Sequence, residues 1–510
     1  MISSTTWVPR GFAAEFPVRY EVDDAEVERI SELAQMRLDD AIEDYDEARE
    51  KDVNDEDGEE ENDDDEVEIM VDEETADVTV ESGNEEDELK EYDLENYDKP
   101  TDSSLSMFTN IKSLSYYGAG EVDPYITLPK KPDGQDYDED EEEEREELQV
   151  YGTDNLLLVT KTQDNLSQLE VYVYDEPDKN LYVHHDILLP SFPLCVEWLD
   201  VRVGRTRTAD DTTGSFAAVG TFEPTIEIWN LDVVDGMYPD AILGSTDPDV
   251  VPEKKTKKGK KTKKTKKANE KYHVDAVLAL SANRQHRSLL ASGSADKTIK
   301  LWDLTALQCA RSYGFHTDKV CSLAWHPEEG SVLLTGSYDR SVVASDMRAP
   351  EAEHRRWGVD ADVETVKWDP HESNYFYVST ESGRVYYYDA RTAPASVGKS
   401  KPVWTLQAHD SEVSTMDVNS HVKGLIATGS TDQTVKLWNV ADNKPSLVSS
   451  RDIGVGRVFS VSWLPDKEAG RTLAVGGSNG VVQVWDTKKN DTVRAAADED
   501  DQEEDEDEDE

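Results

Sequence analysis

Short apolar segments that end on an aromatic residue followed by an acid or amide recur along the chain. Apolar residues in each copy occupy alternate positions, the pattern of a β-strand with one buried face. Six copies lie at residues 171–175 (VYVYD), 226–230 (IEIWN), 299–303 (IKLWD), 385–389 (VYYYD), 435–439 (VKLWN) and 482–486 (VQVWD). A seventh, degenerate copy at residues 342–346 has Ser345 at the aromatic position. The steps between copies are mostly 43 to 55 residues, with one of 73, so the chain is built from a repeated unit.

A second alternating segment precedes each of these and ends in most copies on tryptophan. Copies with the tryptophan lie at residues 193–198, 320–325, 363–368 and 458–463, and copies without it at 277–282 and 413–418. The missing seventh copy is at the N-terminus, at residues 2–7, where Trp7 is followed by Val8 and Pro9. Seven segments of the second kind then accompany seven of the first.

Turn residues separate these segments, as at 294–297 and 430–433. Short alternating strands with tight turns, repeated at this period, predict small antiparallel sheets arranged about an axis. The pattern resembles the WD-repeat family, and the resemblance implies an all-β fold, a seven-bladed β-propeller of four-stranded blades. It covers residues 1–9 and 151–495. Blade one is then split, with its inner strand at the N-terminus and the rest after residue 150, which closes the ring and removes a sheet edge.

Charge is concentrated outside this repeated body. The net charge is −59, with 53 acidic and 12 basic residues in 1–150 and 12 acidic and no basic residues in 496–510. Residues 151–495, with 47 acids and 41 bases, are near neutral. Because acidic runs bury too little apolar surface to offset chain entropy, we expect a mostly disordered insertion at 10–150 and a disordered tail at 496–510. No apolar run approaches the ~18 residues of a membrane span, so we expect a soluble protein.

One segment of the insertion has the pattern of a helix, near residues 24–45. Asp23 is placed to cap it, with Glu26 reaching back. The apolar residues that share one face of this helix are Val27, Ile30, Ala34, Leu38 and Ala41. The pattern leaves open whether that face packs against the propeller or docks a partner.

Three sets of residues combine a histidine, a hydroxyl residue and an aspartate, as a hydrolase triad does. They are His273, Ser292 and Asp296, leading to Trp302; His409, Thr428 and Asp432, leading to Trp438; and His316, Thr335 and Asp339, leading to Ser345. A hydrolase needs a single nucleophile, whereas these sets repeat along the chain, so repetition argues against a catalytic role. The WD-repeat resemblance implies instead a hydrogen-bonded network that joins the strands of a blade, as buried polar groups require. We expect this network to be weak or absent in the blades that end at Ser345 and at Tyr388, the second of which has no equivalent histidine.

No other motif points to catalysis or to a cofactor. His184, His185 and Asp186 are adjacent, and neighbouring residues on a strand point to opposite faces, so we expect no metal site there. No GxxxxGK[ST], HExxH or CxxC motif is present. The three cysteines, Cys195, Cys309 and Cys321, are too few for a disulfide framework and indicate a reducing compartment. The N-terminus lacks the pattern of a secretory signal, so we expect a non-enzymatic protein inside the cell.

A lysine-rich loop at residues 252–271 accounts for the long step of 73 residues. Its ten lysines are Lys254, Lys255, Lys257, Lys258, Lys260, Lys261, Lys263, Lys264, Lys266 and Lys267. Three interpretations remain open: a nuclear import signal, a contact with the phosphates of RNA, and a solvated loop. Because no aromatic residues or arginines are interleaved, any RNA contact is expected to be electrostatic and salt-sensitive.

Several phrases are similar to one particular family, the periodic tryptophan protein 1 family. They lie at residues 87–98 (DELKEYDLENYD), 123–128 (DPYITL), 182–189 (YVHHDILL), 196–199 (VEWL) and 226–235 (IEIWNLDVVD), with the lysine-rich loop before 275–277 (DAV). The phrases outside the repeats make the resemblance specific. Within them, Tyr92, Leu94, Tyr97 and Tyr125 are candidates for docking, either on this propeller or on a neighbouring protein.

The family resemblance implies a nuclear and nucleolar assembly factor of the large (60S) ribosomal subunit, needed for processing pre-ribosomal RNA. We therefore expect a scaffold that binds pre-ribosomal RNA and neighbouring assembly factors, monomeric within a large particle, with no membrane and no small-molecule substrate. The alternative, also implied by the family, is a histone-binding chromatin or ribosomal DNA transcription factor that uses its acidic tracts. Those tracts also fit a merely solubilising role. The sequence does not identify the contacted RNA segment, the neighbouring factors or the binding face.

Overall fold

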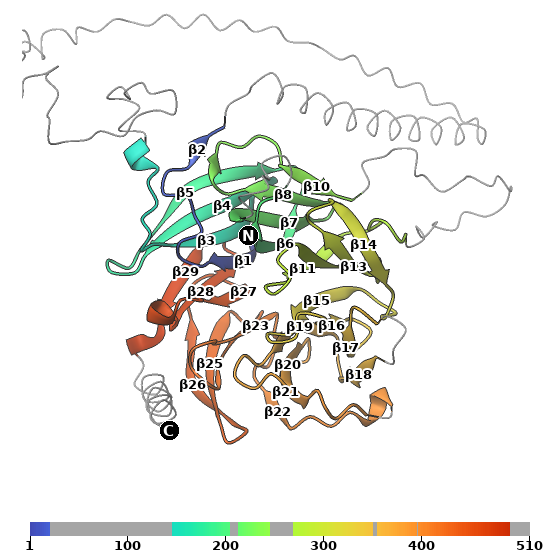
Figure 1. Cartoon of the computed structure of the whole chain (residues 1–510). Coiled ribbons are helices and arrows are strands. Elements are labelled where there is room, and N and C mark those ends of the chain that lie inside the picture. Colours follow the sequence, from blue (N-terminus) through green and yellow to red (C-terminus); the bar gives the residue numbers. More distant parts are fainter. Residues whose placement is uncertain (21–144, 204–212, 245–268, 350–353, 395, 490–510) are drawn as a thin grey trace, which may run out of the picture. The chain divides into compact units, whose positions relative to one another are not determined.

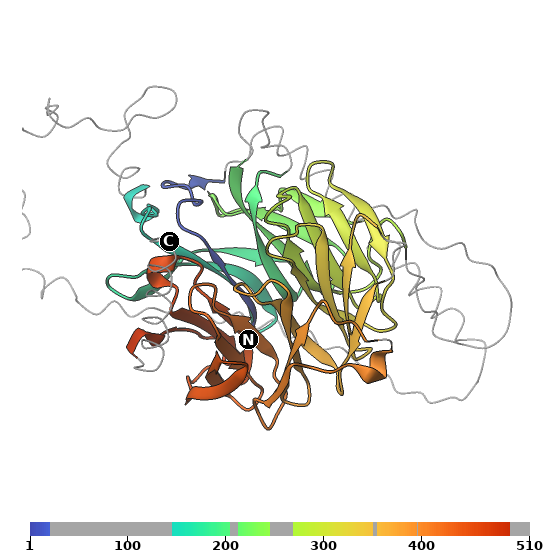
Figure 2. The same ribbon diagram turned by 60° about the horizontal axis from the view of Figure 1, so that its bottom comes forward.

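Seven small antiparallel sheets form the folded part of the chain. The computed structural model describes residues 1–20, 145–203, 213–244, 269–349, 354–394 and 396–489. Figures 1 and 2 show the sheets arranged around a common centre as the blades of a propeller. The prediction of an all-β, seven-bladed propeller is confirmed. The predicted helix near 24–45, most of the lysine-rich loop and the acidic tail lie outside the described residues.

The first four blades each have four strands, which follow one another from the centre of the ring outward. Blade one consists of β1 (Ile2–Val8), β3 (Asn155–Gln163), β4 (Leu166–Asp175) and β5 (Asn180–Leu189); blade two of β6 (Pro193–Val201), β7 (Thr213–Thr221), β8 (Ile226–Asn230) and β10 (Ala241–Leu243); blade three of β11 (Val277–Ala282), β12 (Leu289–Ser294), β13 (Ile299–Asp303) and β14 (Gln308–Tyr313); blade four of β15 (Val320–Trp325), β16 (Val332–Ser337), β17 (Ser341–Asp346) and β18 (Arg355–Gly358).

The last three blades follow the same order, and blade seven has three strands in the described residues. Blade five consists of β19 (Val363–Trp368), β20 (Tyr375–Thr380), β21 (Arg384–Asp389) and β22 (Trp404–Gln407); blade six of β23 (Thr415–Val418), β24 (Leu425–Gly429), β25 (Thr434–Ala441) and β26 (Lys444–Asp452); blade seven of β27 (Val458–Trp463), β28 (Thr472–Gly477) and β29 (Val482–Asp486). The remaining elements are the parallel pair β2 (Val18–Arg19) and β9 (Val233–Val234), and the 3-10 helices η6 (Val397–Lys399), η7 (Lys467–Ala469) and η8 (Thr487–Lys489). No helix within the described ranges is long and apolar enough to cross a membrane.

The N-terminal strand β1 closes the ring. It pairs with β3 as the inner strand of blade one and lies beside β27, the inner strand of blade seven. The main-chain N–H of Thr5 donates to Ser460 Oγ at 3.0 Å. The equivalent bond, from the fourth residue of one inner strand to a hydroxyl oxygen on the preceding inner strand, joins Val366 to Ser322 and Val461 to Thr415. Strand β1 therefore occupies the register that the inner strands of later blades occupy.

Close approach of a glycine to the next blade repeats around the ring. Each of these glycines lies on a second strand and faces the first residue of the following inner strand; the pairs are Gly220 with Val277, Gly293 with Val320, Gly336 with Val363, Gly429 with Val458 and Gly476 with Ile2. A Cβ atom at position 476 would lie 2.6 Å from Cγ2 of Ile2, closer than packed carbon atoms can stand. Any larger residue at these positions would push two blades apart.

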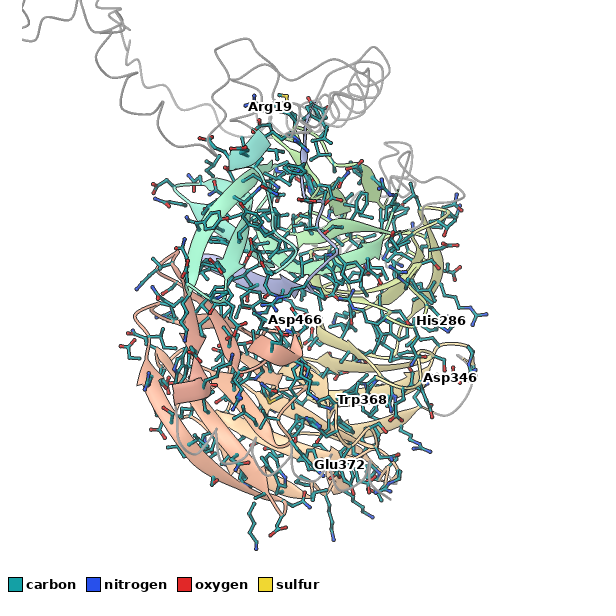
Figure 3. All side chains as sticks on the ribbon, turned by 60° about the vertical axis from the view of Figure 1, so that its left-hand side comes forward. Arg19, His286, Asp346, Trp368, Glu372 and Asp466 are labelled. Atoms are coloured by element: carbon teal, nitrogen blue, oxygen red, sulfur yellow. The ribbon has the colours of Figure 1, made fainter. Side chains whose placement is uncertain are left out.

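The core is divided among the interfaces between blades, and side chains fill the space between the sheets (Figure 3). Between blades one and seven, Ile2, Leu157 and Leu464 are fully buried. Trp7 packs there edge-to-face on Tyr174, with ring centroids 5.9 Å apart. Large aromatic side chains dominate the free energy of burial, so the N-terminal strand is a structural part of the ring.

Candidate functional site

The histidine, serine and aspartate of blade three form one buried chain of hydrogen bonds. His273 Nδ1 lies 3.0 Å from Asp296 Oδ2, and its Nε2 lies 2.7 Å from Ser292 Oγ. The indole N–H of Trp302 donates to the same Ser292 oxygen at 2.8 Å. Burial raises the pKa of Asp296, but hydrogen bonds from His273 and Thr298 outweigh burial and bring that pKa down to about 2. Ser292 is fully buried and already bound by two partners, so it is not placed to attack a substrate.

Blade six repeats this arrangement with threonine in place of serine. His409 Nδ1 lies 2.9 Å from Asp432 Oδ2, and its Nε2 lies 2.9 Å from Thr428 Oγ1. Trp438 Nε1 donates to that hydroxyl oxygen at 3.0 Å. Burial lowers the pKa of His409, which favours the neutral imidazole. This series of hydrogen bonds links the loop before β23 to the second and third strands of the blade.

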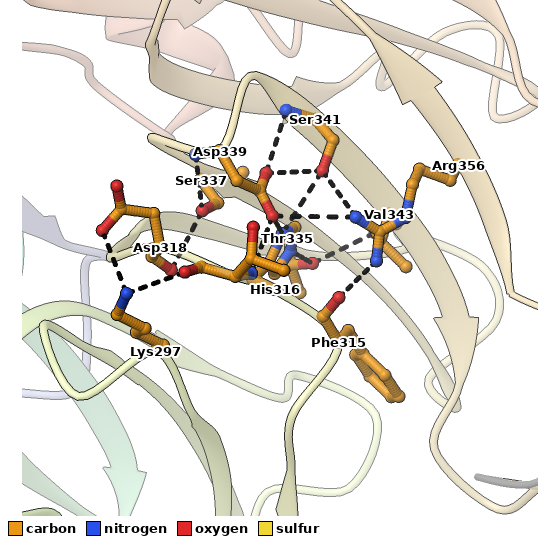
Figure 4. Close-up of polar contacts among 12 residues, drawn as sticks. Lys297, Phe315, His316, Asp318, Thr335, Ser337, Asp339, Ser341, Val343 and Arg356 are labelled. Atoms are coloured by element: carbon orange, nitrogen blue, oxygen red, sulfur yellow. Dashed lines mark hydrogen bonds and ion pairs between the residues drawn. The ribbon is translucent and has the colours of Figure 1, made fainter. Parts of the chain in front are cut away.

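Blade four forms most of the network, so the expectation that it is weak or absent there is wrong (Figure 4). His316 lies 3.0 Å from Asp339 Oδ2 and 2.8 Å from Thr335 Oγ1. The hydrogen bonds of His316 do not require a tryptophan, so this blade lacks only the bond that a tryptophan donates to the hydroxyl in blades three and six. The hydroxyl of Ser345, which stands at the tryptophan position, has no hydrogen-bond partner within the described residues. Arg356 adds an ion pair to Asp339, at 3.6 Å.

Blade five, which lacks the histidine, has a different buried cluster that the sequence did not reveal. Tyr377 and Tyr387 both donate their hydroxyl groups to Asp369 Oδ2, at 3.0 and 2.8 Å. Burial, followed by the charge of Asp369, raises the pKa of Tyr377. The signal available in the sequence was an aspartate directly after the inner-strand Trp368, with tyrosines on the next two strands.

His184 and His185 lie on the same side of β5, which corrects the prediction that they point to opposite faces. Their Nδ1 atoms are 2.7 Å apart. The register of β4 with β5 shifts between Val171 and Tyr172, opposite this pair, and such a bulge turns two neighbouring side chains together. Burial, and then the neighbouring His184, lowers the pKa of His185 to about 4. In the described residues no group of three or more possible metal ligands is found.

A cluster of carboxylates lies on one face of the ring. The inner strands begin at this face, which we call the upper face. The carboxylate cluster comprises four residues on blades five and six: Asp362, Glu364, Glu381 and Glu412. Burial, followed by the charges of Glu412, Glu381 and Asp362, raises the pKa of Glu364 to about 8. Burial and Glu381 also raise the pKa of Glu412. The four residues come from three separate loops and one strand, so their proximity follows from the topology and was missed from the sequence.

The remaining predicted site residues lie outside the described ranges. These are the ten lysines between 254 and 267 and the docking candidates Tyr92, Leu94, Tyr97 and Tyr125. The structure does place the two ends of the lysine-rich loop: β10 ends at Leu243, and the chain is described again from Asn269, before β11. The loop therefore joins the outer strand of blade two to the inner strand of blade three, at the upper face.

Comparison with known proteins reveals relatives over almost the whole chain. A family model described as WD domain, G-beta repeat matches residues 266–303, 307–343 and 400–439. An uncharacterised WD repeat-containing protein of Schizosaccharomyces pombe is 50% identical over 97% of this chain and 90% of that protein. Periodic tryptophan protein 1 of Saccharomyces cerevisiae is 40% identical over 97% of this chain and 89% of its own. A Drosophila melanogaster homolog of periodic tryptophan protein 1 is 33% identical over 93% and 91%.

Proposed function

Because the chain belongs to the periodic tryptophan protein 1 family of WD-repeat proteins, we propose that it is a non-enzymatic scaffold in assembly of the large ribosomal subunit. In this role it binds pre-ribosomal RNA and neighbouring assembly factors, in the nucleus and nucleolus. The observation that carries the proposal is the end-to-end similarity, 40% identity over 97% of the chain, since it includes segments outside the repeats. The role itself is the one that the family resemblance implies.

The polar chemistry of the described residues supports a scaffold over an enzyme. Each histidine that resembles a catalytic base lies inside a blade, bound to an aspartate on one side and a hydroxyl on the other. The hydroxyl oxygens of Ser292, Thr335 and Thr428 are fully buried. A nucleophile must reach a substrate carbonyl or phosphorus, and these groups instead join strands. The upper face and the blade edges then act by binding.

The lysine-rich loop is the proposed contact with RNA. The two described ends of this loop lie at the upper face between blades two and three, whereas the carboxylate cluster lies on blades five and six. Ten lysines within residues 254–267 would neutralise phosphates without reading bases. Binding through them would weaken steeply as salt rises.

Ultraviolet crosslinking in cells, followed by sequencing of the bound RNA, tests this function. The full chain is compared with a variant in which the ten lysines become serine and an external nuclear import signal is added. A matched control changes the same lysines to arginine, which keeps the charge. Crosslinks on the large-subunit precursor that the serine variant loses and the arginine variant keeps are the expected result. Absence of ribosomal crosslinks from the unaltered chain would overturn the proposal.

The carboxylate cluster favours a second candidate, binding of a basic protein such as a histone. Its carboxylates raise one another's pKa, so a cationic partner at this face would relieve repulsion. The two candidates differ in their response to ribonuclease. A ribosomal scaffold sediments with pre-60S particles and is released by ribonuclease, whereas a histone-binding factor co-purifies with histones whether or not RNA is digested.

A further inference from the structure

A small pocket lies on the face of the ring opposite the upper face. We call this the lower face; the ring-closing strand β1 ends there and β3 begins there. Residues within 9–15 and 150–156 supply the walls, which include two carboxylates, Glu15 and Asp154. The pocket volume is about 110 Å³, well below the ~300–1,000 Å³ of a small-molecule site. It therefore has room for a single side chain rather than for a whole small ligand.

Asp154 is a buried carboxylate that is weakly bound in this pocket. The residue is 8% exposed, and the main-chain N–H of Tyr151 and the hydroxyl of Thr153 donate to its carboxylate at 3.3 Å each. Both bonds are longer than is usual for their kind. An ionised carboxylate accepts up to about four hydrogen bonds, so Asp154 retains accepting capacity. Burial raises its pKa, and a cation placed against it would stabilise the ionised form.

Arg10 is a neighbouring cation, but it is bound elsewhere. Its Nε donates to Asn155 Oδ1 at 3.0 Å, and its two terminal nitrogens form ion pairs with Glu176 at 3.3 Å and Glu468 at 2.9 Å. Its charge lowers the pKa of Asp154 by less than burial raises it. Among the residues that the structure describes, none forms an ion pair with Asp154. Buried carboxylates are normally paired, so this one is available to a cation from another molecule.

Two exposed tyrosines accompany this carboxylate. Tyr151 lines the pocket and is 59% exposed, and Tyr182 on β5 is 40% exposed. The pocket residue Leu156 pairs with Val173, which pairs with Tyr182. Paired residues share one side of a sheet, so Tyr182 lies two strands, or roughly 10 Å, from the pocket wall. Burial, followed by the charge of Asp154, raises the pKa of Tyr182, which agrees with this placement.

We propose that this pocket binds an arginine side chain of a protein partner. A guanidinium pairs with a carboxylate through two parallel N–H bonds and stacks on aromatic rings, so Asp154 and Tyr151 offer both of the contacts that it favours. The apolar Val150 and Leu156 in the wall would cover the aliphatic stem. Glu15 adds negative charge, which attracts a cation and repels the phosphates of RNA. The inference goes beyond the proposed scaffold role, which assigns no pocket to a protein neighbour.

Ligand-observed nuclear magnetic resonance on the full chain tests the pocket. The probe is N-acetylarginine methylamide, and its citrulline analogue keeps the shape of the side chain without the charge. The lysine analogue keeps the charge without the planar guanidinium. Because the chain has a net charge of −59, any cation will bind weakly elsewhere, so the pocket is identified by comparing variants. We expect arginine to bind more tightly than lysine and the citrulline analogue not to bind. Equal affinity for arginine and either analogue would contradict the proposal.

Three variants locate the binding. Asp154→Asn should weaken arginine binding at least about tenfold, through loss of a charge-assisted pair. Tyr151→Ala should weaken it about threefold, and this position is exposed, so the loss will not reflect unfolding. The matched control, Asp178→Asn, removes the same charge from the exposed turn between β4 and β5, outside the pocket lining, and should leave the affinity within about twofold. Equal weakening by Asp154→Asn and Asp178→Asn, or no effect of Tyr151→Ala, would refute the pocket and leave the scaffold proposal untouched.

Discussion

The indole N–H of Trp7 donates to the main-chain oxygen of Ser462 at 3.1 Å, across 455 positions of sequence. Trp325 and Trp368 make the equivalent bond to Ser281 and Ala324 of the blades that precede theirs, at 3.0 and 3.1 Å. The junction of the first and last blades therefore uses the same contact as internal junctions. Closure of the ring depends on a strand contributed by the first eight residues.

The first prediction concerns this closing strand. Trp7→Ala removes the bond to Ser462 and a side chain that is 6% exposed. We expect the free energy of unfolding to fall by about 3–5 kcal/mol, as for other buried tryptophans changed to alanine, in urea titrations followed by circular dichroism. Val18→Ala is the control, because Val18 is 65% exposed and its loss should cost no more than about 0.5 kcal/mol. Similar losses for the two variants would contradict the role of β1 in closure.

The second prediction is a coupling between Gly476 and Ile2. Gly476→Ala would place a methyl group 2.6 Å from Cγ2 of Ile2 and should destabilise the protein by about 1–3 kcal/mol, the usual cost of overpacking. In the Ile2→Ala background that methyl group has no Cγ2 atom to meet, so Gly476→Ala should cost clearly less. A double-mutant cycle by urea unfolding measures the difference. Gly152→Ala is the control, since a Cβ there meets nothing within 4 Å. Additive losses would show that the two positions do not touch.

Repeated local patterns made the fold predictable from the sequence. Seven copies of two alternating segments determine the number of blades, and the copy at residues 2–7 identifies the inner strand of blade one because it has the same spacing to Trp7 and Pro9. Local reasoning failed where geometry depends on an inserted or distant residue. The bulge opposite Tyr172 turns His184 toward His185, and no alternation rule anticipates an extra residue.

Buried polar clusters were predictable only where they repeat. The sets around His273 and His409 have the same spacing, so one suggests the other. Asp369 and its two tyrosines occur once and give no repeated signal. The carboxylate cluster joins segments from two blades, and such proximity follows only from the completed ring.

The third prediction compares the polar networks of blades six and four. Thr428→Val leaves both His409 Nε2 and Trp438 Nε1 without their hydroxyl partner, whereas Thr335→Val leaves only His316 Nε2. Each buried polar group without a partner costs about 1–3 kcal/mol. The substitution keeps the shape of the side chain, so we expect Thr428→Val to lower the free energy of unfolding by about 1–3 kcal/mol more than Thr335→Val. Thermal or urea unfolding of the two variants measures this difference in the free energy of unfolding. Equal losses would mean that the tryptophan bond contributes nothing.

The fourth prediction is a dependence of stability on pH that originates at Glu364. Its pKa is about 8 in the folded protein against an ordinary value of 4.5. Between these two values the unfolded chain has released the proton and the folded chain keeps it. Folding then takes up a proton, and the contribution of this group to stability falls as pH rises from about 4.5 to 8.

Glu364→Gln tests that dependence because the amide stays neutral throughout. We expect the variant to gain stability relative to the unaltered chain steadily as pH is raised from 5 to 8, measured as the difference between their unfolding midpoints at each pH. Glu223→Gln is the control, since Glu223 is exposed and should leave the pH profile unchanged. Parallel profiles for the Glu364→Gln variant and the unaltered chain would mean that the carboxylate cluster is solvated, and would remove the repulsion on which the basic-partner candidate depends.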